Sequence, residues 1–441
     1  MRKIALISEH ASPLATIGSV DSGGQNVYVA HVALQLAKLG YSVDVFTRRD
    51  NDSCDVVVEW LPGVRVIHVP AGPARFIAKE RMLPHMDRFA RFMIHFARKN
   101  DIQYDLVHAN FFMSGMVAEQ FKQATGTPFV ITFHALGRVR RLCQGKSDGF
   151  PDIRFTIEER LMQQADRVIA ECPQDKRDME QLYFADPDKI DIVPCGFDSE
   201  EFQAAPANAR LKLGLNDDEF VVLQLGRMVP RKGVDNVIRA VGILKETHDI
   251  LARLLIVGGN TAEPDPVHTP EIGKLQALAE SLGIAEQLVF TGQRSRKELH
   301  YYYSAADVFV TTPWYEPFGI TPIEAMACGT PVIGAAVGGI KSTVVDGQTG
   351  FLVPPKDPDA LAQKLAWLQK HPKTAQRFGW AGMRRAYQQY TWRSVAERIA
   401  RVYESALADL PVENDGTYGE PLQQSPLQPA VVFPVQPQIF R

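Results

Sequence analysis

Short apolar segments and helix-like segments alternate along this chain, and the alternation runs through twice. The first run begins with an apolar segment at Ile4–Ile7 and a helical pattern from about Asn26 to Lys38. The pattern loosens around Pro194–Asn216 and restarts with an apolar segment at Phe220–Leu225 and a helical pattern at Val234–Lys245. Strands that alternate with helices predict βαβ units and a parallel sheet. The sequence therefore predicts two α/β domains, with ligand-facing loops after the carboxyl ends of their strands.

The length and composition agree with two globular domains. A chain of 441 residues is too long for one ordinary hydrophobic core. Its net charge of −3 gives no indication of binding to nucleic acid or to an anionic membrane. We expect Rossmann-like domains at 1–195 and 196–385, a helix at about 386–408 that packs back on the first domain, and a disordered tail at 411–441 that is rich in proline and glutamine. A cleft between the domains is the default binding site.

Cysteine usage and apolar runs predict a cytoplasmic protein. The five cysteines form no C-x-x-C pair, which fits a reducing compartment. The apolar run near Met1 is too short for a signal peptide and is better explained as a first strand, and no stretch is long enough to span a bilayer. Apolar residues at helical spacing in Arg81–Lys99 favour a helix that packs on the core over a basic amphipathic helix that binds a membrane. We expect no membrane association.

The segment 314–333 has the composition of a loop, a short helix and a strand. Thr321 suits a helix N-cap, Pro322 suits the first helical position, and Gly329 suits the end of the helix. The free N–H groups of such a helix start favour an anion. Glu316 and Glu324 bracket this end, as expected for a site that holds a diphosphate between two polyols. Glu324 could instead only complete a capping box with Thr321.

The whole string from Trp314 to Ile333 resembles the E-x7-E motif of the retaining glycosyltransferases of family 4, which have the GT-B fold. A second match is the Gly-Arg-x4-Lys-Gly spacing, which places Arg227 and Lys232 in a diphosphate site, whereas Arg231 is a neighbour without an implied role. A generic basic turn would be solvated, but this spacing favours phosphate binding. The resemblance extends from Met1 to about Leu410. It implies two Rossmann-like domains that face each other across a cleft.

The resemblance implies a set of donor-binding and catalytic residues. Paired glycines before a helix also let backbone amides approach a phosphate, and this loop resembles that of sucrose-phosphate synthases, sucrose synthases and inositol-phosphate glycosyltransferases. The implied donor contacts are Gly23, Gly24, Arg227, Lys232, Gly258, Arg294, Phe318, Gly319, Ile320, Thr321 and Glu324. The implied catalytic residues are His134, Glu316, Arg227 and Lys232, with His134 and Glu316 against the transferred sugar.

Acceptor contacts are expected in the first domain. Residues that resemble acceptor-binding positions are Asn26, Lys79, Arg140 and Arg154. If the three cations converge, a phosphate on the acceptor is their natural ligand, but solvated surface residues are the alternative. Phe111 and Ala135 stand where the inositol-phosphate enzymes have hydroxyl groups, which argues against that acceptor.

No metal or other cofactor is expected. D-x-D strings occur at Asp50–Asp52, Asp186–Asp188 and Asp357–Asp359, and metal-dependent transferases of another fold use such a motif, but solvated loops explain all three. Cations and a helix start would replace the metal.

These observations predict a retaining glycosyltransferase. It would move a hexosyl group, expected to be glucosyl, from a nucleoside diphosphate sugar to a hydroxyl of a sugar or sugar phosphate. The alternatives are a nucleotide-sugar epimerase of GT-B fold, a phosphorylase with lysine-bound pyridoxal phosphate, and a non-catalytic protein that binds nucleotide sugars.

Overall fold

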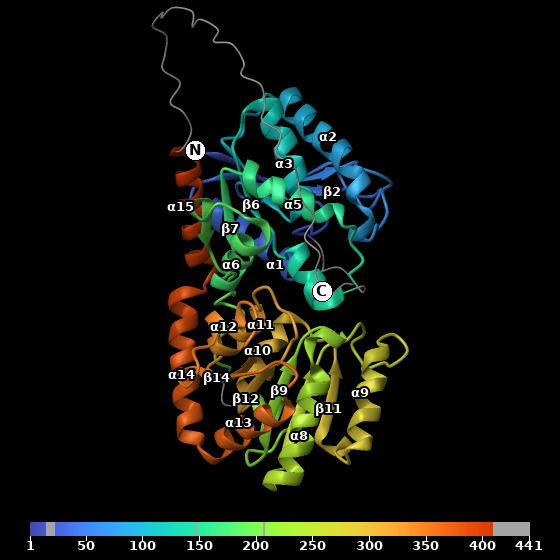
Figure 1. Cartoon of the computed structure of the whole chain (residues 1–441), viewed down its shortest axis with the longest axis vertical. Coiled ribbons are helices and arrows are strands. Elements are labelled where there is room, and N and C mark those ends of the chain that lie inside the picture. The colour runs from blue at the N-terminus through green and yellow to red at the C-terminus, as the bar shows by residue number, and fades with distance from the viewer. Residues whose placement is uncertain (15–22, 146–147, 206–207, 409–441) are drawn as a thin grey trace, which may run out of the picture.

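The computed structural model describes residues 1–14, 23–145, 148–205 and 208–408. Two lobes stack along the long axis of the molecule, and each is built on its own sheet (Figure 1). The expected tail at 411–441 lies outside the described residues.

The first lobe contains a sheet of eight strands within the described residues, in the order β3-β4-β2-β1-β5-β6-β7-β8. All neighbouring strands are parallel except the edge pair β3 and β4. The strands are β1 Lys3–Ile7, β2 Ser42–Arg48, β3 Val57–Leu61, β4 Val64–Val69, β5 Leu106–Asn110, β6 Phe129–Thr132, β7 Arg167–Ala170 and β8 Ile190–Ile192. The order turns at β1 and β5, and ligands of such sheets bind outside the carboxyl ends at this place.

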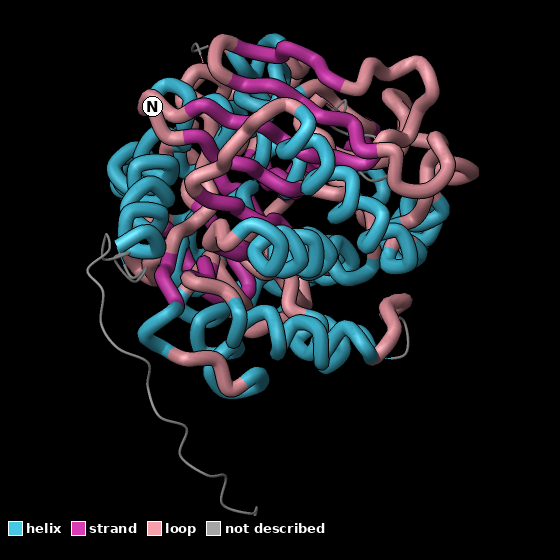
Figure 2. The backbone as a smooth tube through the Cα atoms, turned by 90° about the horizontal axis from the view of Figure 1, so that it is seen from above, coloured by secondary structure: helices cyan, strands magenta, loops and turns pink. Residues whose placement is uncertain are grey.

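Helices lie on both sides of these strands, as the view from above shows (Figure 2). They are α1 Gly24–Lys38, α2 Met86–Lys99, α3 Phe112–Thr125, α4 Gly137–Gln144, α5 Ile153–Gln164 and α6 Pro173–Tyr183, with 3-10 turns η1 Lys79–Arg81, η2 Leu83–His85 and η4 Pro187–Lys189. The helix expected over Arg81–Lys99 begins at Met86, because Pro84 sits in the preceding 3-10 turn.

The second lobe repeats this architecture with a parallel sheet in the order β11-β10-β9-β12-β13-β14 across the part of the chain that is described. Its strands are β9 Phe220–Leu225, β10 Ala252–Val257, β11 Leu288–Gly292, β12 Val308–Thr311, β13 Val332–Ala335 and β14 Gly350–Val353. Its helices and turns are α7 Ala209–Lys212, η5 Pro230–Lys232, α8 Val234–His248, α9 Pro270–Ser281, η6 Ala285–Gln287, α10 Arg296–Ala305, α11 Ile320–Ala327, α12 Ile340–Thr343 and α13 Pro358–Lys370.

Two C-terminal helices connect the lobes. Helix α14 (Pro372–Gln389) lies along the second lobe, and α15 (Trp392–Ala408) runs up the side of the first lobe (Figure 1). Phe197 pairs with Thr391 in an isolated β-bridge, so the two chain segments that pass between the lobes are joined. On the first lobe, the hydroxyl of Tyr403 lies 2.7 Å from Nδ1 of His108. Burial lowers the pKa of His108 to about 3, so its ring is neutral within the fold.

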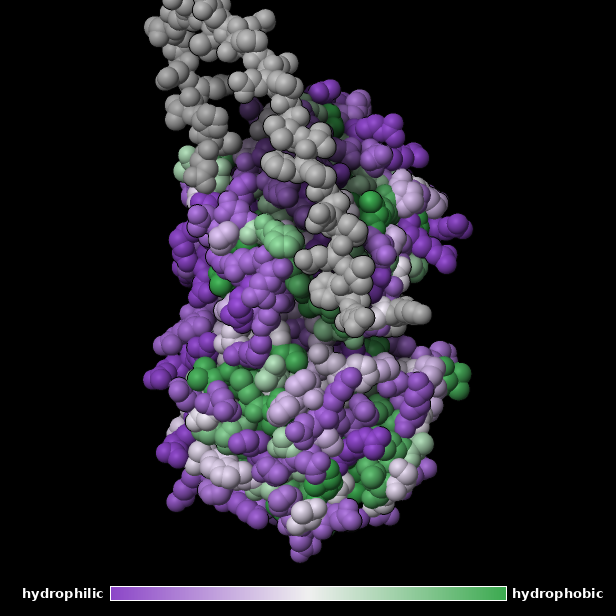
Figure 3. Space-filling view, viewed as in Figure 1, coloured by the Kyte–Doolittle hydropathy of each residue, from purple (hydrophilic) through white to green (hydrophobic). Residues whose placement is uncertain are grey.

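Helix α2 turns its apolar residues into the core, where Met86, Phe89 and Met93 are fully buried. Hydrophilic residues dominate the visible surface around this helix (Figure 3). Among the described residues, no helix is both long and apolar enough to cross a membrane.

Candidate active site

A cleft of about 840 Å³ lies between the two lobes, and loops from both sheets line it. Most of the residues implied by the sequence reach this cleft. Those that line it are Gly23, Gly24, Asn26, Lys79, His134, Arg140, Arg227, Lys232, Glu316, Phe318, Gly319, Ile320 and Thr321. The tertiary structure therefore brings together residues that are almost 300 positions apart in the chain.

The start of α11 forms one wall of the cleft. The helix begins at Ile320, and Gly319 is its N-cap with a φ of 89°. The expectation that Thr321 caps this helix is wrong, because Thr321 already lies inside its first turn. The expected end is confirmed, since Cys328 closes the helix and Gly329 follows with a φ of 80°. The first N–H groups of α11 remain available at the cleft for an anion.

Glu324 does not complete a capping box, nor does it line the cleft. Its side chain is buried, where it accepts a hydrogen bond of 3.0 Å from the Tyr303 hydroxyl and lies 3.4 Å from Nη1 of Arg296. Burial raises the pKa of Glu324 although Arg296 opposes the shift. Glu324 therefore lies behind the wall of the cleft, and its implied role as a donor contact stays a prediction.

Lys232 and Glu316 form an ion pair on the wall of the cleft. Nζ of Lys232 donates to Oε2 of Glu316, and Nη1 of Arg231 lies 3.7 Å from the same oxygen. Burial alone would raise the pKa of Glu316, but the positive charges of Lys232, Arg231 and Arg227 outweigh it and hold this pKa below its usual value. Glu316 is therefore an ionised acceptor in a positively charged setting, suited to the hydroxyls of a sugar beside a diphosphate.

Gly233 keeps the basic turn close to the loop that carries Glu316. Its φ is 66°, and a Cβ atom at this position would lie 2.1 Å from the carbonyl oxygen of Thr312. The backbone N–H of Trp314 donates to the carbonyl of Arg231 at 2.9 Å. A residue with a side chain would separate the two loops, so glycine is required here.

His134 follows β6 in the first lobe and faces the cleft. Its φ is 59°, in the left-handed region, which a residue other than glycine rarely adopts. Nδ1 lies 2.8 Å from a carboxylate oxygen of Glu171, and Nε2 lies 3.1 Å from the side-chain oxygen of Asn110. The ring also packs edge-on against Tyr28. The sequence analysis did not identify Glu171. Its position directly after β7 could have indicated it, because residues at the carboxyl ends of parallel strands face the ligand site.

The Gly23–Gly24 turn approaches α11 across the cleft. Asn26 holds this turn, because its Oδ1 accepts from the Gly23 N–H at 3.0 Å and its Nδ2 donates to the Ser12 carbonyl at 3.0 Å. A Cβ atom on Gly24 would lie 3.5 Å from the Ile320 side chain. The amide group of Asn26 is thus engaged in shaping the turn rather than directed at a ligand.

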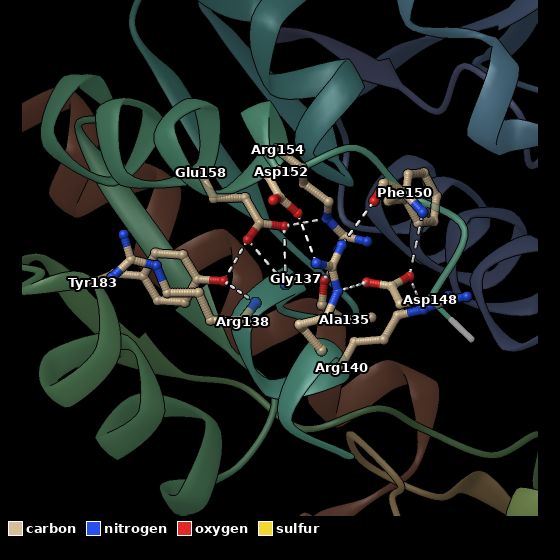
Figure 4. A network of polar contacts seen from close by, with 11 residues as sticks. Ala135, Gly137, Arg138, Arg140, Asp148, Phe150, Asp152, Arg154, Glu158 and Tyr183 are labelled. Atoms are coloured by element: carbon tan, nitrogen blue, oxygen red, sulfur yellow. Dashed lines mark hydrogen bonds and ion pairs between the residues drawn. The ribbon is translucent and has the colours of Figure 1, made fainter. Parts of the chain in front are cut away.

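Arg154 does not reach the cleft, contrary to the expectation from sequence. It is fully buried, and its Nε donates to Glu158 at 2.6 Å (Figure 4). Its guanidinium lies 4.9 Å from the ring of Phe111 and 4.6 Å from that of Phe150, and it also donates to the Ala135 carbonyl. Arg154 therefore fixes the loop after His134 from behind instead of contacting an acceptor.

The other expected contacts fall into two groups. Lys79 and Arg140 line the cleft, but Arg140 is already paired with the buried Asp148 at 2.8 Å. Arg294 and Gly258 lie outside the cleft lining: Arg294 donates to the Ala262 carbonyl at 2.7 Å. A Cβ atom on Gly258 would lie 2.0 Å from the carbonyl oxygen of Gly226, so this glycine permits close approach of two backbones.

The described residues contain no group of three or more histidine, cysteine or acidic residues arranged to hold a metal ion. Two of the D-x-D strings form caps: Asp186 accepts from the N–H of Asp188, and Asp357 accepts from the N–H of Ala360.

Comparison with known proteins identifies the family. The model of the group 1 glycosyl transferases matches residues 207–385, and that of the family 4 glycosyltransferases matches residues 22–201. The chain is a family 4 glycosyltransferase of GT-B fold. Among its relatives, the D-inositol 3-phosphate glycosyltransferase of Kineococcus radiotolerans is 36% identical, over 94% of this chain and 97% of the relative. The enzyme of the same name from Corynebacterium glutamicum is 33% identical, over 95% and 100%.

A solved structure with this glycosyltransferase fold is the sucrose-phosphate synthase of Thermosynechococcus elongatus. It is 34% identical in sequence, with a TM-score of 0.83, and the match covers 92% of this chain and all of that protein. The chain is accordingly a hexosyltransferase that uses a nucleotide sugar.

Proposed function

We propose that this enzyme transfers a glucosyl group, with retention of configuration, from a nucleoside diphosphate glucose to a hydroxyl of a sugar phosphate. The observation that carries the proposal is the arrangement of the cleft. The Lys232–Glu316 pair and the start of α11 lie on one wall, and His134 lies on the wall of the other lobe.

The charged wall suits the departure of the nucleoside diphosphate. As the bond between the sugar C1 and the phosphate oxygen breaks, negative charge grows on that oxygen, close to Arg227, Lys232 and the N–H groups of α11. The acceptor hydroxyl forms the new bond to C1 and gives its proton to the departing phosphate. Because the acceptor hydroxyl attacks C1 directly, no residue needs to form a covalent intermediate. Glu316 and His134 hold the hydroxyls of the transferred sugar.

A phosphate on the acceptor is supported by the cations of the first lobe and by a relative. Lys79 and Arg140 line the cleft on the side of His134. Lys79 and Arg140, which also pairs with Asp148, are the phosphate contacts in this proposal. The similarity to a sucrose-phosphate synthase supports a hexose phosphate. The apolar side chains at Phe111 and Ala135 argue against inositol phosphate, although enzymes with that acceptor are also relatives.

The test is a screen of the full-length protein with UDP-glucose, GDP-mannose and ADP-glucose, each with and without fructose 6-phosphate, fructose or inositol phosphate. We expect release of nucleoside diphosphate that depends on fructose 6-phosphate, and an anomeric product configuration equal to that of the donor by NMR. Lys79→Ala should raise the KM for fructose 6-phosphate and leave the KM for the donor unchanged.

Three results would contradict the proposal. Turnover of the donor without any acceptor would favour an epimerase, and binding of donor without turnover would favour a sensor. Equal use of fructose and fructose 6-phosphate would remove the phosphate contact.

A further inference from the structure

Two residues of α10 hold the carboxylate of Glu324, one at each oxygen. The hydroxyl of Tyr303 donates to Oε2 at 3.0 Å, and Nη1 of Arg296 lies 3.4 Å from Oε1. Glu324 sits on α11 one turn beyond Ile320, a residue of the cleft wall, and residues four apart share a helix face. An ionised carboxylate has about four lone-pair sites, so these two contacts leave it able to accept from two further donors.

Arg296 joins Glu324 to a second carboxylate. Its Nε donates to Oε2 of Glu201 at 2.9 Å. Glu201 belongs to the segment 197–202, here called the linker, through which the chain passes from the first lobe to the second. Only 17% of the Arg296 side chain is exposed. Because a guanidinium is planar and rigid, binding two carboxylates at once fixes its position.

Phe202 of the linker packs against both residues that hold Glu324. The centre of its ring lies 4.9 Å from the guanidinium carbon of Arg296 and 6.0 Å from the ring centre of Tyr303. Phe202 is fully buried, and its N–H donates to the Asp198 carbonyl at 2.8 Å. Since a close-packed interior transmits displacements, a movement of the linker would move the support of Glu324.

The linker is also bound to the first lobe. Oδ2 of Asp198 lies 3.9 Å from Nδ1 of His31 on α1. The ring of His31 is stacked on that of Trp392 at the start of α15, with 5.1 Å between the ring centroids. Helices α10 and α11 lie at the end of the second lobe that faces the first (Figure 1). The linker therefore contacts the first lobe at its beginning and the support of Glu324 at its end.

We propose that Arg296 is a positioning residue for the donor ribose: it holds Glu324 in place to accept from the ribose hydroxyls, and the linker fixes Arg296 through Glu201 and Phe202. This inference rests on the proposed function and on the donor contact implied for Glu324. With Glu316 at the transferred sugar, the ribose is the polyol on the other side of the diphosphate. Arg296 and Glu201 do not line the cleft, so both would act through Glu324.

The test compares each nucleoside diphosphate with its 2′-deoxy form, which lacks one hydroxyl for Glu324. Calorimetric titration of the full-length protein gives Kd values for UDP, ADP and GDP and for dUDP, dADP and dGDP. The pair that contains the tightest ligand is used for the variants. We expect the wild type to bind the ribose form about 10- to 100-fold more tightly, as for one hydrogen bond to a charged group. A wild type without this preference would overturn the proposal.

Two variants of Arg296 follow. Arg296→Gln should reduce the preference for ribose by about threefold or more, as expected for groups in contact. The loss should come from weaker binding of the ribose form. Arg296→Lys keeps the charge without the rigid fork, so its preference should lie between those of Arg296→Gln and the wild type. An unchanged preference in Arg296→Gln would overturn the proposal.

Arg210→Gln is the matched control. Arg210 pairs with Asp307 at 2.8 Å in the same lobe, and its side chain is 18% exposed, close to the value for Arg296. Among the described residues its acceptors include the Asn216 carbonyl and not Glu324. This variant should keep the wild-type preference for ribose. Equal losses in the Arg210 and Arg296 variants would overturn the proposal, because general destabilisation would explain both.

Glu201→Gln tests the part played by the linker. It should lower the preference for ribose less than Arg296→Gln does. The double variant should lose no more than Arg296→Gln alone, because Glu201 would act only through Arg296. Additive losses, or an unchanged or increased preference in Glu201→Gln, would overturn the role of the linker.

A measurement on the wild type does not depend on how the variants fold. Because the N–H of Phe202 is bonded within the linker, its hydrogen exchange reports on the linker. We expect a saturating ribose nucleotide to slow exchange in peptides that cover 197–202 more than its 2′-deoxy form does. Equal exchange with both nucleotides would overturn the proposal. If no nucleoside diphosphate binds the wild type, the proposed function fails instead, and binding is therefore measured first.

Discussion

The carboxylate of Glu316 is bound to the ammonium group of Lys232 on the wall of the cleft, and the two residues lie on different loops of the second lobe. The residue implied for the diphosphate thus neutralises the residue implied for the transferred sugar. A bound donor would replace this pair with two separate contacts, Lys232 to phosphate and Glu316 to sugar hydroxyls. Burial lowers the pKa of Lys232, and the nearby Glu316 opposes the shift.

The first prediction concerns the two neighbouring cations of the basic turn. Lys232→Ala should lower kcat by about 10²–10³-fold, the usual cost of losing one group placed against charge in the transition state. Arg231→Ala should cost far less, because Arg231 Nη1 is engaged with the Tyr315 carbonyl at 3.1 Å. Initial rates of nucleoside diphosphate release measure both. Equal losses in the two variants would contradict the assignment of the phosphate site to Lys232.

The second prediction concerns the fold rather than activity. Arg154→Ala should lower the free energy of unfolding by about 3–5 kcal/mol, because it leaves the buried Glu158 carboxylate without its paired positive charge. Arg393→Ala is a matched control, since Arg393 pairs with Glu397 at the same i,i+4 spacing but is 79% exposed. It should cost less than about 0.5 kcal/mol. Urea denaturation compares the two, and similar losses would contradict the buried pair.

The third prediction is a pH dependence at Asp175. Burial and the neighbouring Glu171 raise the pKa of Asp175 from 3.8 to about 8. Between these two values the folded protein holds a proton that the unfolded chain has lost, so this carboxyl group makes stability fall as pH rises, until about pH 8. Asp175→Asn should remove that fall while keeping an acceptor for the Glu171 N–H.

Thermal denaturation at pH 5 to 9 checks this expectation. The Tm of Asp175→Asn minus that of the wild type should increase with pH and level off above about pH 8. The exposed Asp217→Asn serves as control and should show a constant difference. A constant difference for Asp175→Asn as well would contradict the raised pKa.

The fourth prediction is that EDTA leaves the transfer rate unchanged. In the proposed function, Arg227, Lys232 and the start of α11, which line the cleft, would supply the positive charge that a metal ion otherwise provides. Rates are measured with EDTA, and again after addition of Mg²⁺ or Mn²⁺. If EDTA inhibits transfer and either ion reverses the inhibition, the prediction is wrong and one of the D-x-D strings would be a candidate metal site.

The sequence by itself determined the layered architecture and the charged half of the site. The alternation of apolar and helical segments can be recognised from local periodicity. Arg227, Lys232 and Glu316 belong to short motifs, which can be recognised from their spacing in the sequence alone. The end of α11 was also predictable, because Gly329 adopts a positive φ that terminates a helix locally. Each of these features depends on residues close together in the chain.

The tertiary structure decided which polar residues face the cleft. Nothing local distinguishes Arg154, buried among aromatic rings, from a cation in solvent, and nothing local shows that Glu324 binds Tyr303 and Arg296 instead of the Thr321 amide. The carboxylate that orients His134 comes from Glu171, 37 positions further along the chain, so the orientation of this ring could not be predicted either. Burial and long-range hydrogen bonds are set only when the lobes are packed, and for that reason the composition of the acceptor side could not be predicted from the sequence.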